Sequence, residues 1–281
     1  MSQDRRTFLS NLGMAAVAFR SPRLLGDLFA PRAAKLQRIG MELYTVRSLT
    51  AKDLAGTLAQ LARIGYKEVE FAGYQGHSAV DVRAMLDQNG LTAPSAHIDI
   101  VKIETDADRT FSDAKVVGHK WITIPSLPRG RPQTVDDWKQ VAARFNAAGK
   151  KVKDAGFKLA FHNHNEVFRK AGDELPIDIL IRETDPALVS YQMDVYWVVN
   201  GGGNPVALLG KYPGRFTMLH LKDSMGPPEQ NMADVGSGTI DFKAVLSHAK
   251  GIEHYFVERD DPTDPMASAV ASFKYLSQLE F

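Results

Sequence analysis

Hydrophobic positions follow two alternating periods from residue 38 onward. Short apolar runs, typical of buried strands, are separated by segments in which apolar residues recur every three or four positions, as on one face of a helix. The predicted strands are residues 38–44, 67–71, 91–98, 120–125, 157–166, 189–194, 215–222 and 251–258. The predicted helices are residues 51–64, 79–88, 105–117, 135–155, 176–183, 206–212, 241–249 and 266–279.

Eight strands that each precede a helix predict an α/β protein, a single (β/α)8 TIM barrel, in preference to an open doubly wound sheet. Glycine follows several predicted helices, as at Gly65 and Gly90, where a C-terminal cap favours a left-handed residue. No strand is followed by a Gly-x-Gly-x-x-Gly element, which disfavours a dinucleotide-binding fold. We expect one barrel domain over residues 35–281, preceded by a leader segment over residues 1–34.

The composition is that of a protein with a sizeable core, since 44% of the 281 residues are hydrophobic. The net charge is +1 and the charged residues are scattered, so nothing indicates a nucleic-acid partner. The absence of cysteine excludes disulfides, thiolate catalysis and cysteine-based zinc sites. No apolar run reaches the roughly 20 residues that a spanning helix needs, so we expect no integral membrane span. The sequence leaves the oligomeric state open.

The strand predicted over residues 157–166 ends in a polar run with two histidines and a glutamate. Because side chains alternate between the two faces of a strand, His162, His164 and Glu166 are expected on one face. Imidazole nitrogens and a carboxylate placed in this way are candidate metal ligands or acid–base groups. A histidine-rich surface turn would show the same local pattern, so the ends of the later strands decide between the two.

The later predicted strands end in residues of the same kind. Asp194 closes the sixth strand, His220 and Lys222 lie at the end of the seventh, and Glu258 closes the eighth. In a TIM barrel these strand ends meet at one mouth, where the catalytic groups of such enzymes lie. A divalent cation needs about four protein ligands and an open position for substrate. We therefore predict that one metal ion is bound by His162 or His164, together with Asp194, His220 and Glu258.

These residues belong to a set of short motifs, which run from the first strand to the last. The motifs are Tyr44-Thr45-Val46-Arg47, His162-Asn163-His164-Asn165, Asp194-Val195-Tyr196-Trp197, His220-Leu221-Lys222-Asp223, residues 235–242 and Val257-Glu258-Arg259-Asp260. Through them the chain resembles the xylose-isomerase-like superfamily, in particular its predicted sugar phosphate isomerase/epimerases related to inosose dehydratase. The resemblance covers essentially the whole predicted barrel.

The resemblance implies a Mn²⁺, Mg²⁺, Co²⁺ or Zn²⁺ ion held by Glu, Asp, His and Glu at the ends of the last four strands. Asp194, His220 and Glu258 match these positions, whereas His162 stands where the first glutamate is expected. Two carboxylates balance a dication, and the extra imidazole favours Mn²⁺, Fe²⁺, Co²⁺ or Zn²⁺ over Mg²⁺. We expect one divalent metal ion, with a Mn-like ion favoured. The choice between His162 and His164 as ligand stays open.

The resemblance also implies a reaction, in which a proton next to a sugar carbonyl is removed and the metal stabilises the enediolate. Isomerases and epimerases of this kind use two glutamates, and of that pair the chain retains Glu258. The second base would be His162, His164 or Glu166. Related sequences often have Phe at the position of Glu166 and Glu one residue later, where this chain has Val167, so Glu166 carries less weight as a catalytic residue.

Lys222 is expected on the same strand face as His220, where it would donate a proton or stabilise the enediolate. The alternative for Lys222 is a salt bridge to Asp223 or Glu258. Chemistry with a single base would suit β-elimination, so a dehydratase or a 3-keto-glycoside lyase is the first alternative function. A non-catalytic exported sugar-binding protein is the second. Endonuclease-IV-like nucleases of the same superfamily need more metal ligands and a basic face, and the sequence indicates neither.

Other strand ends are predicted to contact a small-molecule sugar or glycoside substrate. The rings of Tyr44 and Trp197 would stack on a sugar, whereas Glu42 and His97 would bind its hydroxyl groups. Packing in the core is the alternative for each of these residues. Residues 236–239 are predicted to form a flexible loop before a helix cap, in preference to a phosphate cradle. An unphosphorylated substrate is therefore expected.

The segment before the barrel resembles a twin-arginine export signal. Arg5 and Arg6 precede a Phe-Leu pair, a modestly apolar stretch over residues 9–19 and then Arg23, although no clear small-x-small cleavage site precedes Lys35. We expect recognition by the twin-arginine export machinery and a periplasmic location. Membrane tethering is expected if the segment is not cleaved. An ordinary amphipathic helix is the alternative interpretation.

Overall fold

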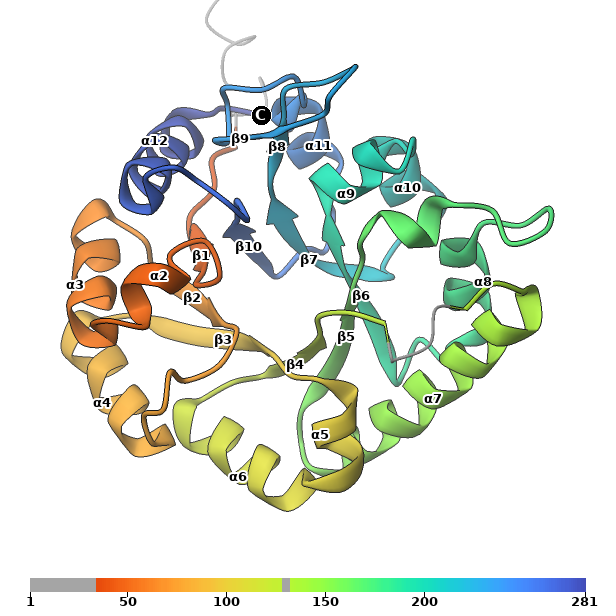
Figure 1. The fold of residues 1–281 in the computed structure, drawn as a ribbon, viewed down its shortest axis with the longest axis horizontal. Helices are drawn as coiled ribbons and strands as arrows, with labels where there is room; N and C mark the ends of the chain where they lie inside the picture. Colours follow the sequence, from red (N-terminus) through yellow and green to blue (C-terminus); the bar gives the residue numbers. More distant parts are fainter. Residues whose placement is uncertain (1–33, 128–131) are drawn as a thin grey trace, which may run out of the picture. The chain divides into compact units, whose positions relative to one another are not determined.

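Eight parallel strands close into a barrel, with helices packed around the outside (Figure 1). The structure is a computed structural model that describes residues 34–127 and 132–281. Around the barrel the strands follow the order β1-β10-β7-β6-β5-β4-β3-β2. They are β1 (Gly40–Glu42), β2 (Glu68–Phe71), β3 (Thr92–His97), β4 (Trp121–Ile124), β5 (Lys158–His162), β6 (Val189–Asp194), β7 (Phe216–Leu221) and β10 (His254–Val257). The predicted TIM barrel is confirmed, and the predicted export signal lies outside the described residues.

The helices of the described residues follow the predicted order with three additions. They are α2 (Arg47–Thr50), α3 (Leu54–Ile64), α4 (Ala79–Asn89), α5 (Ile100–Thr105), α6 (Ala107–Val117), α7 (Val135–Asp154), α8 (Pro176–Glu183), α9 (Val195–Asn200), α10 (Pro205–Lys211), α11 (Phe242–His248) and α12 (Pro265–Gln278). The sequence missed α2, α5 and α9, which have four to six residues each. None of the described helices combines the length and the apolar character that crossing a bilayer requires.

The helix predicted over residues 105–117 is present as α6, which begins two residues later, and the structure adds the short helix α5 before it. Asp99 caps the start of α5, with its side chain accepting a hydrogen bond from the Val101 N–H. The backbone then leaves the helical region at Asp106, where φ is −141°, and α6 begins at the next residue. The break separates α5, which follows β3, from α6. The cavity described below lies between the end of β3 and these two helices.

The prediction of one continuous strand from residue 157 to 166 is wrong. β5 ends at His162, whose last ladder partner is Gln192 on β6. Asn165–Phe168 forms a 3₁₀ helix, labelled η1. Once the ladder ends no partner strand holds the backbone extended, so the alternation expected from His162 to Glu166 does not continue.

Two short strands, β8 (Asp223–Ser224) and β9 (Met232–Ala233), form a small antiparallel sheet directly after β7. The hydrophobic pattern of the sequence did not predict this hairpin. Its strands have two residues each, too few for a period of two to be recognised.

The interior of the barrel contains an apolar layer below its polar mouth. Trp121, Ala160, Met218 and Phe256 come from β4, β5, β7 and β10 and form a cluster separate from the main core. Residues from these strands meet on the inside of a closed barrel, whereas the main core lies between the strands and the helices. The layer separates the two polar ends of the barrel.

Candidate metal centre

The four predicted metal ligands come together at one point. His162, Asp194, His220 and Glu258 each offer a ligand atom, and these atoms lie within 4.8 Å of one another. All four side chains are buried. They come from β5, β6, β7 and the residue after β10, which are neighbours in the closed barrel. The strand register explains the convergence, because Asp194 pairs directly with His220 across the β6–β7 ladder.

The chain itself leaves one oxygen of Asp194 available to a cation. Asp194 is the N-cap of α9, and its Oδ1 accepts a hydrogen bond of 3.0 Å from the Trp197 N–H. Its Oδ2 is buried and has no hydrogen-bond partner among the described residues. That oxygen lies 3.7 Å from His162 Nε2 and 3.1 Å from Lys222 Nζ. This buried oxygen has the Lys222 ammonium at salt-bridge distance but no hydrogen bond, so it can still bind a metal, and the nitrogen and carboxylate donors beside it fit a divalent ion.

The two histidines of the cluster differ in charge. Burial acts to lower the pKa of His220, but the carboxylates of Glu258 and Glu70 outweigh it and raise the pKa to about 10. Its Nδ1 lies 2.8 Å from Glu258 Oε2, and its Nε2 lies 2.5 Å from Glu70 Oε2. Burial, followed by the charge of His220, holds the pKa of His162 well below its ordinary value. Without a metal, His220 is therefore an imidazolium and His162 a neutral imidazole.

Lys222 is fully buried beside the cluster. Its Nζ lies 3.1 Å from Asp194 Oδ2, 2.9 Å from Glu258 Oε2 and 2.7 Å from Asp260 Oδ1. Burial acts to lower its pKa, but Asp194 and Glu258 outweigh burial and raise the pKa above its ordinary value. Of the two salt-bridge partners considered from the sequence, Glu258 is present and Asp223 is not. Lys222 thus places a positive charge beside two of the candidate ligands, Asp194 and Glu258.

The Asp223 carboxylate is used by the loop that follows. It accepts hydrogen bonds of 2.9 Å from the backbone N–H groups of Gly236 and Gly238, and one of 3.2 Å from Ile240. These groups are therefore not free to bind a phosphate. Asp241 caps α11 through the Ala244 N–H, as expected for a loop that leads into a helix cap.

His164 and Trp197 are half-buried beside the cluster. The His164 ring centroid is 4.9 Å from that of His162 and 5.3 Å from that of Trp197. Burial, followed by the charge of Lys222, lowers the pKa of His164 to about 4, so the ring is neutral at neutral pH. Trp197 Nε1 is buried without a hydrogen-bond partner among the described residues.

The structure separates the two histidines that the sequence left as alternatives. His162 contributes a nitrogen to the ligand cluster, whereas His164 enters none of the clusters found among the described residues. Glu166 lies in η1, after the strand has ended, and is likewise outside those clusters.

Glu42, Tyr44 and His97 occupy three different environments. Glu42 is fully buried at the end of β1, where burial, followed by the charges of Glu70 and Glu258, raises its pKa well above the ordinary value. Its Oε1 accepts a hydrogen bond from the Tyr44 N–H, and its Oε2 has no partner among the described residues. Tyr44 is 41% exposed and lies under the Arg47 guanidinium, 4.1 Å from the ring centroid. His97 stays near the cluster, with its ring 5.4 Å from that of His220.

Two buried residues that contact the candidate ligands were not predicted from the sequence. Glu70 on β2 and Gln192 on β6 are both fully buried. Burial acts to raise the pKa of Glu70, but His97 and His220 outweigh it and lower the pKa to about 2. Each residue is polar and stands between two apolar neighbours in a buried strand, and that was the available signal.

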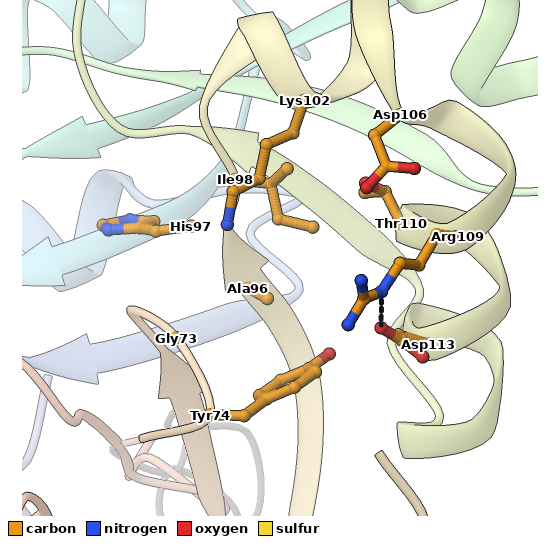
Figure 2. A pocket seen from close by; sticks show the side chains of 10 residues that line it. All are labelled: Gly73, Tyr74, Ala96, His97, Ile98, Lys102, Asp106, Arg109, Thr110 and Asp113. Atoms are coloured by element: carbon orange, nitrogen blue, oxygen red, sulfur yellow. Dashed lines mark ion pairs between the residues drawn. The ribbon is translucent and has the colours of Figure 1, made fainter. Parts of the chain in front are cut away.

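A cavity of about 380 Å³ lies beside the cluster, between the end of β3 and helices α5 and α6 (Figure 2). His97 borders both the cavity and the cluster, since its ring lies 5.2 Å from that of His162. Figure 2 shows Tyr74, Lys102 and Arg109 reaching towards the same space. The volume is within the range of roughly 300–1,000 Å³ that is usual for small-molecule sites.

Known proteins resemble this chain in sequence and in fold. An inosose dehydratase from Clostridium beijerinckii is 32% identical over 127 residues, which are 40% of this chain and 42% of that protein. The chain therefore spans less than half of that relative's length. A sugar phosphate isomerase/epimerase from Parabacteroides distasonis has a crystal structure with a TM-score of 0.77 and 27% identity. That match covers 86% of this chain and 98% of the other.

A further solved structure is that of an IOLI protein with a bound zinc atom, with a TM-score of 0.68 and 16% identity. That match covers 85% of this chain and 96% of the other. At this identity the likeness shows the fold alone. A family model described as xylose isomerase-like TIM barrel matches residues 58–278, and the chain belongs to that family.

Proposed function

We propose that the protein is a divalent-metal-dependent sugar isomerase or epimerase. The observation that carries the proposal is the meeting of four buried ligand atoms within 4.8 Å at neighbouring strand ends. His162, Asp194, His220 and Glu258 would hold the ion. When bound, a divalent metal polarises a substrate carbonyl and stabilises the negative charge that develops when the adjacent proton leaves.

The chain supplies two carboxyl groups, those of Glu258 and Glu42, whose pKa values are shifted in opposite directions. Burial acts to raise the pKa of Glu258, but Lys222 and His220 outweigh it and hold the pKa well below its ordinary value. Glu258 is therefore ionised and is the candidate proton acceptor. Burial, followed by the charges of Glu70 and Glu258, raises the pKa of Glu42, which favours its protonated form and makes it a candidate donor. Carboxyl groups whose pKa values are pushed apart by their environments are the pattern of acid–base pairs in enzymes.

Two further groups would act at the outer side of the substrate. The neutral His164 imidazole can accept a proton, which makes it the candidate for the second base of an isomerase or epimerase. The unpartnered Trp197 Nε1 can donate a hydrogen bond, while its ring offers a face for stacking on a sugar. Lys222 would hold Glu258 ionised and stabilise negative charge that develops nearby.

The cavity beside His97 favours a neutral, hydroxyl-rich substrate. Its wall carries two cations, Lys102 and Arg109, and two carboxylates, Asp106 and Asp113, so the formal charges cancel. The loop N–H groups that might have bound a phosphate are bound to Asp223. Both observations favour an unphosphorylated sugar or glycoside. If the leader is a twin-arginine signal, as its residues suggest, the enzyme acts in the periplasm.

Elimination is the second candidate reaction. Glu258 is ionised beside the Lys222 ammonium, which together provide one base and one proton donor. A β-elimination needs no more than these, and the curated relative reported above is named a dehydratase. A dehydratase or a 3-keto-glycoside lyase would use the same ligands.

Turnover in D₂O distinguishes these functions. The metal-loaded protein would be incubated with aldoses, ketoses, inososes and 3-keto-glucosides, and the products followed by NMR and mass spectrometry. Solvent deuterium next to the carbonyl of an isomeric product would support isomerisation or epimerisation. Loss of water or of an aglycone would support elimination. Binding without exchange would favour a non-catalytic sugar-binding protein.

A further inference from the structure

Gln192 lies at the centre of a buried hydrogen-bond network below the candidate ligands. Its Oε1 is 3.0 Å from His162 Nδ1 and 3.1 Å from His97 Nε2. Its Nε2 is 2.9 Å and 3.0 Å from the two oxygens of Glu70. Figure 1 places β2 and β6, the strands that carry Glu70 and Gln192, on different sides of the barrel. The contact therefore crosses the barrel interior.

Donor and acceptor chemistry fixes the direction of each hydrogen bond. A carboxylate can only accept, so the amide nitrogen of Gln192 must face Glu70 and its oxygen must face the imidazoles. The oxygen can only accept, so His162 must donate from Nδ1. A neutral imidazole that carries its proton on Nδ1 keeps a bare lone pair on Nε2. That atom lies on the ligand side, 3.7 Å from Asp194 Oδ2.

Glu70 directly fixes which ring nitrogen of the second histidine, His220, carries the proton. Its Oε2 accepts a hydrogen bond from His220 Nε2. A proton held on Nε2 leaves Nδ1 as the His220 nitrogen that faces Glu258 and the rest of the cluster. One carboxylate thus selects the ligating nitrogen of both histidines, of His220 by contact and of His162 through Gln192.

We propose that Glu70 and Gln192 are positioning residues that set the metal-binding tautomers of His162 and His220. The proposal rests on the metal-binding part of the proposed function and is independent of which reaction follows. Histidine ligands usually donate their other N–H to a carboxylate or carbonyl, and loss of such a partner typically costs about 10- to 100-fold in metal affinity.

The rival role for Glu70 is that of a ligand to a second ion. Glu42, Glu70, His97 and His220 also offer ligand atoms within 4.8 Å of one another. However, Glu70 already accepts from Ser95 Oγ, twice from Gln192 and once from His220. A carboxylate has about four lone-pair positions, and these four hydrogen bonds use them. A second ion would have to break the network.

The test compares metal affinity in three variants of the full chain. In Glu70→Gln, an amide replaces the carboxylate, and two amides facing each other cannot satisfy both histidines. If the oxygen of the new amide serves His220, its nitrogen points at Gln192, which must then turn its own nitrogen towards His162 and reverse that tautomer. We expect calorimetric titration with Co²⁺, Mn²⁺ and Zn²⁺ to show an affinity about 10- to 100-fold weaker.

The exchange variant Glu70→Gln/Gln192→Glu restores the direction of every bond to the ligands. The amide now on β2 would accept from His220 and donate to the carboxylate now on β6, which would accept from His162. We expect it to recover most of the lost affinity, an outcome that a merely structural role for Glu70 does not predict. Glu68→Gln is the matched control. Glu68 is buried on the same strand and binds His254 Nδ1 at 2.8 Å, but its substitution should leave metal affinity unchanged.

Histidine ¹⁵N–¹H correlation spectra of the Zn²⁺-loaded wild type test the proposal without any variant. We expect the proton of His162 on Nδ1 and that of His220 on Nε2. The opposite tautomer at either residue, wild-type affinity in Glu70→Gln, or failure of the exchange variant to improve on Glu70→Gln would overturn the proposal. Two ions per wild-type chain and one in Glu70→Gln would make Glu70 a ligand instead. A wild type that binds none of the three metals defeats the metal site itself, whereas one that binds metal without turnover defeats only the proposed catalysis.

Discussion

Strand β2 carries two buried glutamates, and they face opposite ends of the barrel interior. Glu68, at the start of the strand, binds His254 Nδ1 at 2.8 Å and lies 3.5 Å from Arg38. Glu70, two residues later, binds His220 and Gln192. Both glutamates have a histidine partner, so their local chemistry is alike.

The ends of the barrel differ in how completely their charges are satisfied. At the end near Glu68, Lys158 lies 2.8 Å from Glu253, and both side chains reach solvent, with exposures of 55% and 42%. At the opposite end the Lys222 ammonium serves several carboxylates at once, including Asp194 and Glu258. There, Oδ2 of Asp194 has no hydrogen-bond partner among the described residues.

Charged residues inside this barrel therefore have different roles at its two ends. The end near Glu68 is satisfied by its own side chains, and its Lys158–Glu253 pair is exposed to solvent. The mouth has more buried carboxylate than the chain neutralises, so it favours an added cation. Because the apolar layer around Met218 and Phe256 separates the ends, changes at one end should leave the other intact.

The largest expected effect is loss of the metal in His220→Ala. Loss of a hydrogen-bond partner of a metal-binding histidine costs up to about 100-fold in metal affinity. We expect a larger fall in metal affinity here, because a ligand itself is removed. His254→Ala, which removes the histidine partner of Glu68, should bind metal like the wild type. Metal content by mass spectrometry after desalting measures both. Retained metal in His220→Ala would remove His220 from the ligand set.

Glu258→Gln should lower turnover by about 10²- to 10⁴-fold, because an amide cannot accept the substrate proton. The size of the side chain is kept, so circular dichroism should show an unchanged fold. Glu253→Gln, at the start of the same strand region, is the control and should keep the wild-type rate. Deuterium exchange into substrate is the readout, and a wild-type rate in Glu258→Gln would exclude Glu258 as the base.

The metal-free protein should lose stability as the pH rises above neutrality. The pKa of His220 is raised on folding from 6.5 to about 10, so its contribution to stability is complete below pH 6.5 and is lost as the pH approaches 10. One such proton changes the free energy of unfolding by up to about 1.4 kcal/mol per pH unit. Denaturant unfolding in EDTA between pH 6.5 and 10 measures the slope. The slope should be absent in His220→Gln and present in His254→Gln.

The smallest expected effect is that of Lys158→Ala at the satisfied end. An exposed ion pair of this kind contributes at most about 1 kcal/mol to the free energy of unfolding, and metal affinity should not change. Thermal unfolding and calorimetric titration with Mn²⁺ measure the two quantities. A clear change in metal affinity would show that the two ends are coupled across the apolar layer.

Much of the fold followed from periodicity, which is a local property of the chain. The predicted bounds of α8 and β6 match the structure to the residue, and those of α10, predicted over residues 206–212, differ by one residue. The failures were also local. α9 is short and begins at Val195 directly after β6, and β5 stops at His162 although β6 continues to Asp194. No hydrophobic period marks such boundaries.

The sequence by itself determined which residues stand at the strand ends, since a residue's place in a βα unit follows from the chain. His162, Asp194, His220 and Glu258 were found in this way. Only the tertiary structure decided what lies beneath them. Glu70 and Gln192 are 122 residues apart, and they meet because closing the barrel brings opposite strands face to face. The pattern along a strand tells which side chains point inward, but their partners depend on the shear and closure of the whole sheet.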